Sequence, residues 1–388
     1  MRGRTRHNCQ LHYYAGPAAQ PRPQGICIFE SMTASRPRLI ALYLPQFHPI
    51  PENDAWWGAG FTEWTNTANA KPLFRNHYQP HVPADLGFYD LRVPESREAQ
   101  ARLARDYGIE AFCYYHYWFA GRRIIERPFN EVLASGRPEF PFCLCWANQT
   151  WSGIWHGNPE RVLIEQTYPG REDYRAHFEA LLPAFRDPRY VTVDGKPLFL
   201  VFRPHQIPHA REFTACWREL ASQAGLKGLH LVGMQNNATR WRPQDDGFDA
   251  MNTTGFPGPG PKSFKHAPVK WLIRRLRKAA GKPEIYYYKD VIEHLRPKKR
   301  PGIADYPTLV PNWDNTPRSG RRGRVLHNST PELFRRHIRD VLEFVRDIPQ
   351  EQNLVFIKSW NEWAEGNHLE PDLKFGLQYL RVLREECR

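Results

Sequence analysis

The stretch Leu354-Val355-Phe356-Ile357-Lys358-Ser359, followed directly by Trp360-Asn361-Glu362-Trp363-Ala364-Glu365-Gly366, is the part of the sequence that most strongly indicates the fold. Its first half is a short, nearly continuous apolar run, which is typical of a strand buried on both faces in a parallel sheet. Its second half places two carboxyl groups and two indoles immediately after that strand. In a barrel of parallel strands, this is the position where active-site residues lie.

Other short apolar runs resemble the one at 354–359 and alternate with helical patterns. Together they predict strands at 38–44, 110–115, 141–146, 197–202, 228–234, 248–252, 306–310 and 354–359. The predicted helices are 94–107, 126–135, 172–186, 209–224, 285–296, 330–347 and 373–386. Because strands alternate with helices throughout, we expect an α/β protein, and this number of strands predicts a (β/α)8 TIM barrel.

The chain length of 388 residues suits one barrel with long βα loops, and no second domain is expected. We assign residues 37–388 to this domain and interpret the Gly-, Pro- and Lys-rich segment 253–284 as a long loop insertion. Residues 1–36 are rich in Arg, Pro and Gln without periodicity, so we expect a disordered or misassigned N-terminal arm. Met32, just before the first strand, is the expected natural start.

The composition bears on the compartment and on the partners. The chain has 7 cysteines and no CxxC pair, and residues 1–30 contain no signal-like apolar core, so we expect reduced thiols and a cytoplasmic location. The formal net charge is +13, with basic clusters at 270–278, 296–300 and 318–324. These clusters could contact an anionic inner membrane peripherally, although a solvated basic surface explains each equally well. Because the charge is patchy, no nucleic-acid partner is expected.

Polar and aromatic residues gather directly after most of the predicted strands, and the carboxyl ends of barrel strands meet at one face. The candidate substrate-binding residues of this kind are Gln46, His48, His116, Tyr117, Trp118, Trp146, Asn148, Arg203, Gln235, Trp313, Asp314, Trp360 and Asn361. Amides, imidazoles and indoles suit a hydroxyl-rich ligand such as a sugar.

Glu362 and Glu365 are the candidate catalytic residues. Cleavage of a glycosidic bond requires two carboxyl groups, one to protonate the leaving oxygen and one to act as base or nucleophile. If the chain turns helically after the strand, residues three apart point the same way, and burial beside Trp360 and Trp363 would raise the pKa of one carboxyl. The alternative is a solvated pair at the start of a helix.

No cofactor and no metal are expected from the motifs. The sequence contains no GxxxxGK[ST] phosphate loop and no GxGxxG after a strand. His48, His77, His81, His116 and Glu63 could coordinate a cation, but no HExxH or CxxC spacing supports a metal site.

Several aromatic-rich motifs occur in order along residues 38–386. They are Leu42-Tyr43-Leu44-Pro45-Gln46-Phe47-His48-Pro49, Trp56-Trp57-Gly58, Gly60-Phe61-Thr62-Glu63-Trp64, Trp146-Ala147-Asn148, Trp313-Asp314-Asn315-Thr316 and the stretch 360–366. In these motifs the chain resembles the WbsX-like glycosyltransferase group, which is also described as carrying a domain like glycoside hydrolase family ninety-nine. That resemblance implies a (β/α)8 barrel and a role in bacterial surface polysaccharide metabolism, of the O-antigen or lipopolysaccharide type.

The resemblance also implies roles for residues. Family ninety-nine enzymes are retaining endo-α-mannosidases and mannanases. By that likeness Glu362 would be the base toward the sugar 2-hydroxyl, and Glu365 would be the general acid/base. By position in the motifs, the implied sugar contacts are His48, Trp118, Trp146 and Asn148, together with Trp57, Glu63 and Trp64. The implied substrate is an oligosaccharide or polysaccharide, free or lipid-linked.

Three functions that involve a glycan remain open from the sequence, and a nucleic-acid binder is the weakest, fourth alternative. The first is a retaining enzyme that cleaves or transfers glycosidic bonds with the glutamate pair. The second is a donor-dependent glycosyltransferase acting on a lipid-linked glycan, which would use the basic clusters at the membrane. The third is a non-catalytic glycan-binding barrel.

Overall fold

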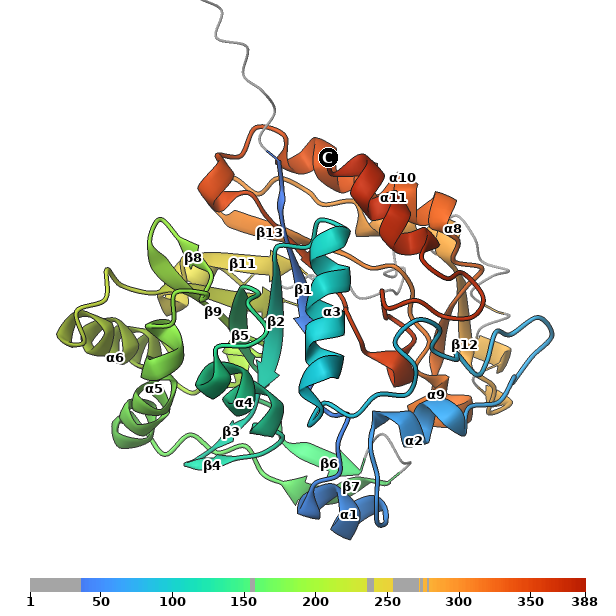
Figure 1. Ribbon diagram of the computed structural model, residues 1–388, viewed down its shortest axis with the longest axis horizontal. Coiled ribbons are helices and arrows are strands. Elements are labelled where there is room, and N and C mark those ends of the chain that lie inside the picture. Colours follow the sequence, from blue (N-terminus) through green and yellow to red (C-terminus); the bar gives the residue numbers. More distant parts are fainter. Residues whose placement is uncertain (1–35, 154–157, 236–240, 254–271, 273–274, 278) are drawn as a thin grey trace, which may run out of the picture. The chain divides into compact units, whose positions relative to one another are not determined.

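The predicted barrel is confirmed. A computed structural model describes residues 36–153, 158–235, 241–253, 272, 275–277 and 279–388. Within them, parallel strands pair in sequence order around a closed ring, because the last strand pairs with the first (Figure 1). The strands are β1 (Arg38–Tyr43), β2 (Ala111–His116), β5 (Phe142–Trp146), β9 (Lys196–Val201), β10 (His230–Gln235), β11 (Ala250–Thr253), β13 (Ala304–Leu309) and β15 (Leu354–Ile357). Each lies at a predicted strand, with ends that differ by a few residues.

The barrel strands are buried on both faces, which explains their nearly continuous apolar runs. Every residue of β2 and β5 is buried. The interior is packed with side chains, as the contact of 3.4 Å between Cys145 Sγ and Met234 Sδ shows. These residues lie on β5 and β10, which are separated by β9, so their contact crosses the barrel. The cysteines within the described residues are free thiols.

Helices surround the barrel on the outside (Figure 1). They are α3 (Pro94–Asp106), α4 (Arg127–Ser135), α5 (Arg171–Phe185), α6 (Ala210–Gln223), α8 (Tyr288–Leu295), α10 (Pro331–Val345) and α11 (Gln378–Glu386). The start of α10 shows why a helix forms there: Thr330 precedes Pro331, and its side chain accepts a hydrogen bond of 3.3 Å from Leu333 N. Within the described residues, no helix combines the length and the apolar character needed to cross a membrane.

Two helix predictions are too long at their N-terminal ends. Residues 284–287 form a strand, β12 (Glu284–Tyr287), which pairs with β14 (Arg324–His327), and α8 begins only after it. Residues 373–377 belong to a turn, because Asp372 accepts hydrogen bonds from the backbone of Lys374 and Phe375. Aspartate in such a turn competes with helix formation.

The loops at the carboxyl ends of the strands carry short elements that the sequence did not predict. They are α1 (Pro51–Trp57), α2 (Glu63–Ala68), α9 (Thr316–Ser319), the hairpins β3 (Trp118–Phe119)–β4 (Arg122–Arg123) and β6 (Trp151–Gly153)–β7 (Asn158–Ile164), and the 3-10 turns η2 (Pro204–Gln206), η5 (Gly320–Arg322) and η7 (Trp363–Glu365). In Figure 1 the arrows of β1 and β2 point toward α1, α2, β6 and β7, at the lower edge of the view. Further short elements lie away from this face: β8 (Thr192–Val193), η3 (Pro243–Asp246) and η6 (Gln350–Gln352).

Some predictions fall outside the described residues. These are the N-terminal arm apart from Arg36, the possible start at Met32, most of the loop insertion 253–284 and most of the basic cluster 270–278.

Candidate active site

Glu362 lies just beyond β15, and its carboxylate is held by Lys358, the residue that directly follows that strand. The side chain is buried, with 4% of the residue exposed. Lys358 Nζ lies 3.1 Å and 3.0 Å from its two carboxylate oxygens, and Asn367 donates a third hydrogen bond at 3.3 Å. Lys358 also reaches the hydroxyl of Tyr115 at 3.3 Å. Glu362 is therefore stabilised in its ionised form.

Glu365 follows in the 3-10 turn η7, which replaces the helical turn expected there. Arg318 of α9 donates a hydrogen bond of 2.8 Å to its Oε1, and the other end of the same guanidinium donates to both oxygens of Glu63 at 2.8 Å. Glu63 has no exposed surface, and it also accepts a hydrogen bond of 2.9 Å from the backbone of Ala364. Thus α2 and α9 together position the turn that carries Glu365.

The two carboxyl groups have pKa values that are displaced in opposite directions. Burial alone raises the pKa of Glu362, but the charge of Lys358 and a hydrogen bond with Glu365 outweigh it and lower that pKa below the usual range. Burial raises the pKa of Glu365, and the neighbouring charge of Glu362 raises it further against the opposing effect of Arg318. A pair of this kind holds one carboxylate and one neutral acid at neutral pH.

The backbone beyond Glu365 is locked against Asp314. Asp314 N donates a hydrogen bond of 2.7 Å to Glu365 O, and the carboxylate of Asp314 binds His77 Nε2 at 2.6 Å and Gln79 Nε2 at 2.8 Å. Gly366 has a φ of 62°, and a Cβ on it would lie 2.9 Å from the Asp314 backbone nitrogen. Asp314, a predicted substrate contact, is thus bound by protein groups. Its role at the site is to hold the backbone of Glu365 in place.

Tyr115, Lys358 and Arg318 were missed as site residues by the sequence reasoning. Lys358 could have been found, because it is the one charged residue in the otherwise apolar predicted strand 354–359. Tyr115 adjoins the candidate His116 on β2 and hydrogen bonds to Glu362, whose charge raises the pKa of Tyr115 after the larger effect of burial. Arg318 was assigned to a surface cluster, and nothing in the sequence pairs it with Glu63.

Tyr117 and Trp313 lie near the glutamate pair, as predicted. Burial chiefly raises the pKa of Tyr117, and the charge of Glu362 contributes to the shift. The ring of Trp313 lies 5.5 Å from Lys358 Nζ. Gln235 is buried at the carboxyl end of β10, on the same face of the barrel.

His116, Trp118 and Trp146 do not point into the barrel mouth, contrary to the expectation. They surround His177 of α5: His116 Nε2 lies 2.9 Å from His177 Nε2, and the ring centroids of Trp118 and Trp146 lie 4.7 Å and 4.8 Å from that imidazole. Successive residues of a strand face opposite sides. Because Tyr115 faces the interior, His116 and its partner in register, Trp146, face the helices. These three side chains are engaged in packing, and the site proposed below does not use them.

Two candidate amides brace neighbouring strand ends. Asn148 accepts a hydrogen bond of 2.7 Å from Arg203 N and donates one of 2.9 Å to Arg203 O. Asn361 does the same for Leu44, at 2.7 Å and 3.0 Å. Both amides thereby join the backbones of adjoining loops, and the guanidinium of Arg203 lies 5.0 Å from the ring centroid of Phe202.

The remaining candidates are placed mainly by packing. Trp64 donates a hydrogen bond of 2.7 Å to Tyr89 O, and Trp360 is fully buried. His48 is also buried, and burial lowers the pKa of its imidazole. The ring centroid of Trp57 lies 6.1 Å from that of Phe61. The carbonyl of Gln46 accepts a hydrogen bond of 3.0 Å from Glu63 N, which ties the first strand end to α2.

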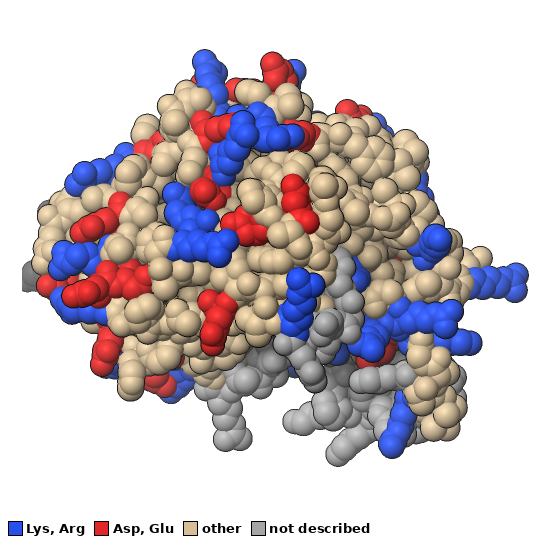
Figure 2. Space-filling model, turned by 90° about the horizontal axis from the view of Figure 1, so that it is seen from below, with Lys and Arg blue, Asp and Glu red and all other residues tan. Residues whose placement is uncertain are grey.

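Some arginines of the basic clusters are engaged by carboxyl groups of the protein, so they are less available to an anionic partner than the sequence suggested. Arg318 belongs to the site, and Arg296 pairs with Asp340 at 2.6 Å. Figure 2, which views the side toward which β1 and β2 point, shows acidic and basic side chains interspersed on its left and basic ones prevailing on its right.

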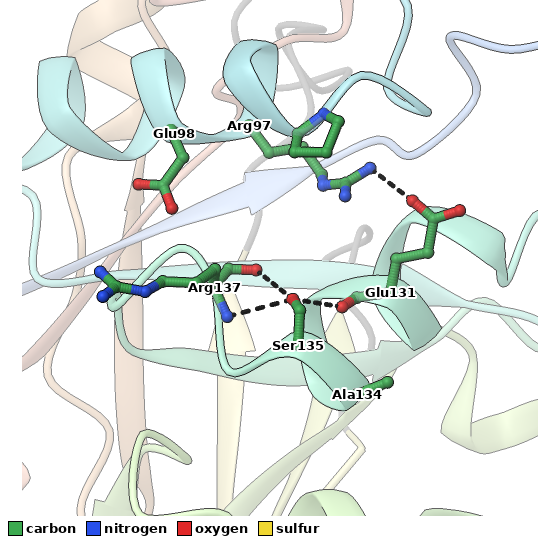
Figure 3. A pocket seen from close by; sticks show the side chains of 7 residues that line it. Arg97, Glu98, Glu131, Ala134, Ser135 and Arg137 are labelled. Atoms are coloured by element: carbon green, nitrogen blue, oxygen red, sulfur yellow. Dashed lines mark hydrogen bonds and ion pairs between the residues drawn. The ribbon is translucent and has the colours of Figure 1, made fainter.

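A hollow on the outside of the barrel is separate from this site. It lies between α3 and α4, where Arg97 binds Glu131 at 2.8 Å and Ser135 Oγ donates to the carbonyl of Glu131 at 2.6 Å (Figure 3). Its lining residues all come from these two helices or the residues next to them, so it does not adjoin the glutamate pair.

Comparison with known proteins adds the family. Residues 39–383 match the family described as Glycosyltransferase WbsX. The chain belongs to the WbsX family. Two curated relatives from strains of Xanthomonas campestris pv. campestris, both described as uncharacterized protein WxcX, are 40% identical over 350 residues. The match covers 89% of this chain and 49% of each relative, so the chain spans about half the length of the curated relatives it matches.

Solved structures show the same fold. A protein described as glycoside hydrolase-like is 15% identical, with a TM-score of 0.54 over 91% of this chain and 94% of that one. The GH99 endo-alpha-mannosidase from Bacteroides thetaiotaomicron is 13% identical, with a TM-score of 0.54 over 90% of this chain and 96% of that one. At such low identity the likeness concerns the barrel alone.

Proposed function

We propose that this WbsX-family chain cleaves or transfers glycosidic bonds of a bacterial surface polysaccharide with retention of anomeric configuration, using Glu362 and Glu365. One observation carries the proposal: two buried carboxyl groups lie together beyond a barrel strand, with pKa values displaced in opposite directions. Glycosidic bond chemistry needs this division between an ionised carboxylate and a neutral acid.

In the first step Glu362 accepts the proton of the sugar 2-hydroxyl while O2 attacks C1. The bond from C1 to the leaving oxygen breaks, and Glu365 donates its proton to that oxygen. In the second step Glu365 accepts a proton from water or from a sugar hydroxyl, which attacks C1 and opens the 1,2-anhydro ring. O2 then recovers its proton from Glu362. Two inversions at C1 give net retention.

The ion pair with Lys358 favours a second role for Glu362. A carboxylate that is stabilised by an ammonium at 3.0 Å is a weak base, and it is better suited to direct attack on C1. A 2-deoxy-2-fluoro analogue of the substrate separates the two roles, because it has no 2-hydroxyl. The base mechanism predicts no covalent adduct with this analogue. A glycosyl adduct on Glu362, detected by peptide mass spectrometry, would assign Glu362 as the nucleophile.

The decisive experiment is a digest of a glycan library, followed by NMR analysis of the anomeric configuration of the first products. We expect retained products from the wild type and none from Glu365→Gln. The matched control is Glu179→Gln, which changes an exposed glutamate of α5 and is expected to leave turnover unchanged. Unchanged turnover by Glu365→Gln, or inverted products, would contradict the proposal.

A donor-dependent glycosyltransferase is the second candidate, and the description of the matched family favours it. It predicts turnover only when a sugar donor and an acceptor are both present. Lipid-linked oligosaccharide is the acceptor to test against free oligosaccharide, with and without vesicles that contain anionic lipid. Cleavage of a free glycan without donor or vesicles would exclude this candidate.

A further inference from the structure

His81, His368 and Asp372 come together beside the loop of the glutamate pair. One nitrogen from each imidazole and one oxygen of the carboxylate all lie within 4.8 Å of one another. His81 belongs to the loop after α2, whereas the other two follow η7. Backbone hydrogen bonds of 2.9 Å from Ala84 N to Pro371 O and from Leu373 N to Val82 O hold the two segments side by side.

The three side chains are oriented toward a common point. His368 Nδ1 lies 2.9 Å from the carbonyl of Glu370, so its Nε2 is directed at His81 Nδ1, also at 2.9 Å. Histidines that bind metals usually donate their other ring N–H to a carbonyl or carboxylate in this way. Asp372 Oδ1 accepts hydrogen bonds of 3.0 Å and 2.7 Å from the backbone of Lys374 and Phe375, which fix its carboxylate.

We propose that His81, His368 and Asp372 bind a divalent transition-metal ion, for which Zn²⁺ is the best match. Two imidazole nitrogens and one carboxylate oxygen form a known zinc ligand set, and water completes the tetrahedron. With Zn–N bonds of about 2.0–2.1 Å, two nitrogens on one tetrahedral ion are about 3.3 Å apart, so a small separation of the two rings suffices. Binding requires that His81 carry its proton on Nε2.

The site would join the loop after α2 to the catalytic loop. The ring of His368 stacks on that of Trp363, with centroids 3.7 Å apart and planes 9° apart. Trp363 begins η7, the turn that ends with Glu365. The ion would therefore act as a structural cross-link behind the catalytic turn. This inference does not depend on the proposed reaction, since metal binding can be measured without substrate.

One positive charge opposes the ion. Lys374 lies over the ring of Tyr78, with its Nζ 4.4 Å from the centroid, and its charge reaches His81. Lys374→Met keeps a long side chain and removes that charge. We expect this variant to bind Zn²⁺ several-fold more tightly than the wild type, an effect that an unspecific surface site would not show.

The test uses the full chain without a polyhistidine tag, dialysed against EDTA, freed of chelator and titrated with ZnCl₂ in a calorimeter. Metal content after gel filtration is measured by mass spectrometry. We expect one equivalent of Zn²⁺ in the wild type and none in His81→Ala or His368→Ala. His294→Ala, which removes an exposed histidine of α8, is the matched control and is expected to bind like the wild type.

Thermal unfolding distinguishes a variant that has lost the metal site from one that fails to fold. Saturating Zn²⁺ is expected to raise the Tm of the EDTA-treated wild type by several degrees, because an ion that binds only the native state stabilises it. His368→Gln is expected to unfold cooperatively without a Zn²⁺-dependent shift. Substoichiometric zinc in the wild type, or equal zinc in the wild type and His81→Ala, would overturn the proposal.

Discussion

Arg318 donates a hydrogen bond of 2.8 Å to Glu365, and the second amino group of the same guanidinium forms an ion pair of 2.8 Å with Glu63. One buried cation thus contacts two buried carboxyl groups from separate loops. The charge of Arg318 opposes the rise in the pKa of Glu365. It also compensates the negative charge of the Glu63 carboxylate.

Arg318→Ala is expected to destabilise the chain strongly. It leaves Glu63 as an uncompensated buried charge, a change that typically costs about 3–5 kcal/mol. Urea unfolding at neutral pH measures this loss. Arg318→Ala combined with Glu63→Gln should recover part of it, because the orphaned charge is removed. If the double variant is no more stable than Arg318→Ala, the ion pair does not carry the effect.

The pH dependence of kcat/KM is expected to follow the two shifted carboxyl groups. The proposed mechanism requires ionised Glu362 and protonated Glu365. Since the pKa of Glu362 is lowered, activity should persist well into the acid range. Since the pKa of Glu365 is raised to about 8, activity should fall as the pH rises through the mildly alkaline range. An alkaline limb near the pKa of an ordinary glutamate would contradict the assignment of Glu365.

Lys358→Met is expected to move the acid limb of that profile to higher pH. The charge of Lys358 is the chief influence that lowers the pKa of Glu362, and without it burial raises that pKa. Glu362 would then be protonated over more of the acid range. The measurement is the pH profile of kcat/KM on a substrate found in the library digest, with Lys289→Met on α8 as a control of equal charge change.

Gly366→Ala is expected to cost more stability than Gly136→Ala. Both glycines have a left-handed φ, 62° and 70°. The left-handed conformation costs alanine about 1 kcal/mol. Only at Gly366 would the new Cβ also lie about 2.9 Å from the backbone of Asp314. Denaturant unfolding of the two variants measures the extra cost of the close contact with Asp314. Equal losses of unfolding free energy in both variants would show that the backbone of Asp314 moves aside.

The buried pair His116 and His177 is expected to weaken the fold in acid. Burial holds both pKa values well below the usual 6.5. Arg123 contributes to both shifts, and His116 also lowers the pKa of His177. The unfolded chain therefore binds more protons below pH 6.5 or so, and stability falls as the pH drops through that range. The slope of unfolding free energy against pH should decrease in His116→Gln, whereas His294→Gln should leave it unchanged.

Much of the barrel could be predicted because its strands and helices follow from patterns of apolar residues that are close together in the sequence. Strands buried on both faces are short apolar runs, and all barrel strands were placed from these runs. The short elements α1, α2 and α9 were missed. They are too short for a periodic pattern, and they are stabilised by distant groups, such as Arg318 against Glu63.

Within the site, predictions were best where position along a strand decides the direction of a side chain. Glu362 and Glu365 do lie together beyond β15. The error for His116 and Trp146 came from treating every residue at a strand end as facing the mouth. Alternation along β2 allows either Tyr115 or His116 to face the interior, and the packing of His177 against the outer side determines which one does.

The sequence by itself determined the barrel, and it predicted the end at which chemistry is expected and the two candidate glutamates. These follow from apolar periodicity and from residue type, both of which are properties of neighbours in the chain. Only the tertiary structure decided which groups shift the pKa values of the two glutamates, which aromatic residues are engaged in packing and which distant histidines meet. Those outcomes depend on burial and on separations of about 3 Å between groups far apart in the chain, because a carboxyl pKa responds to the charges and the water around it.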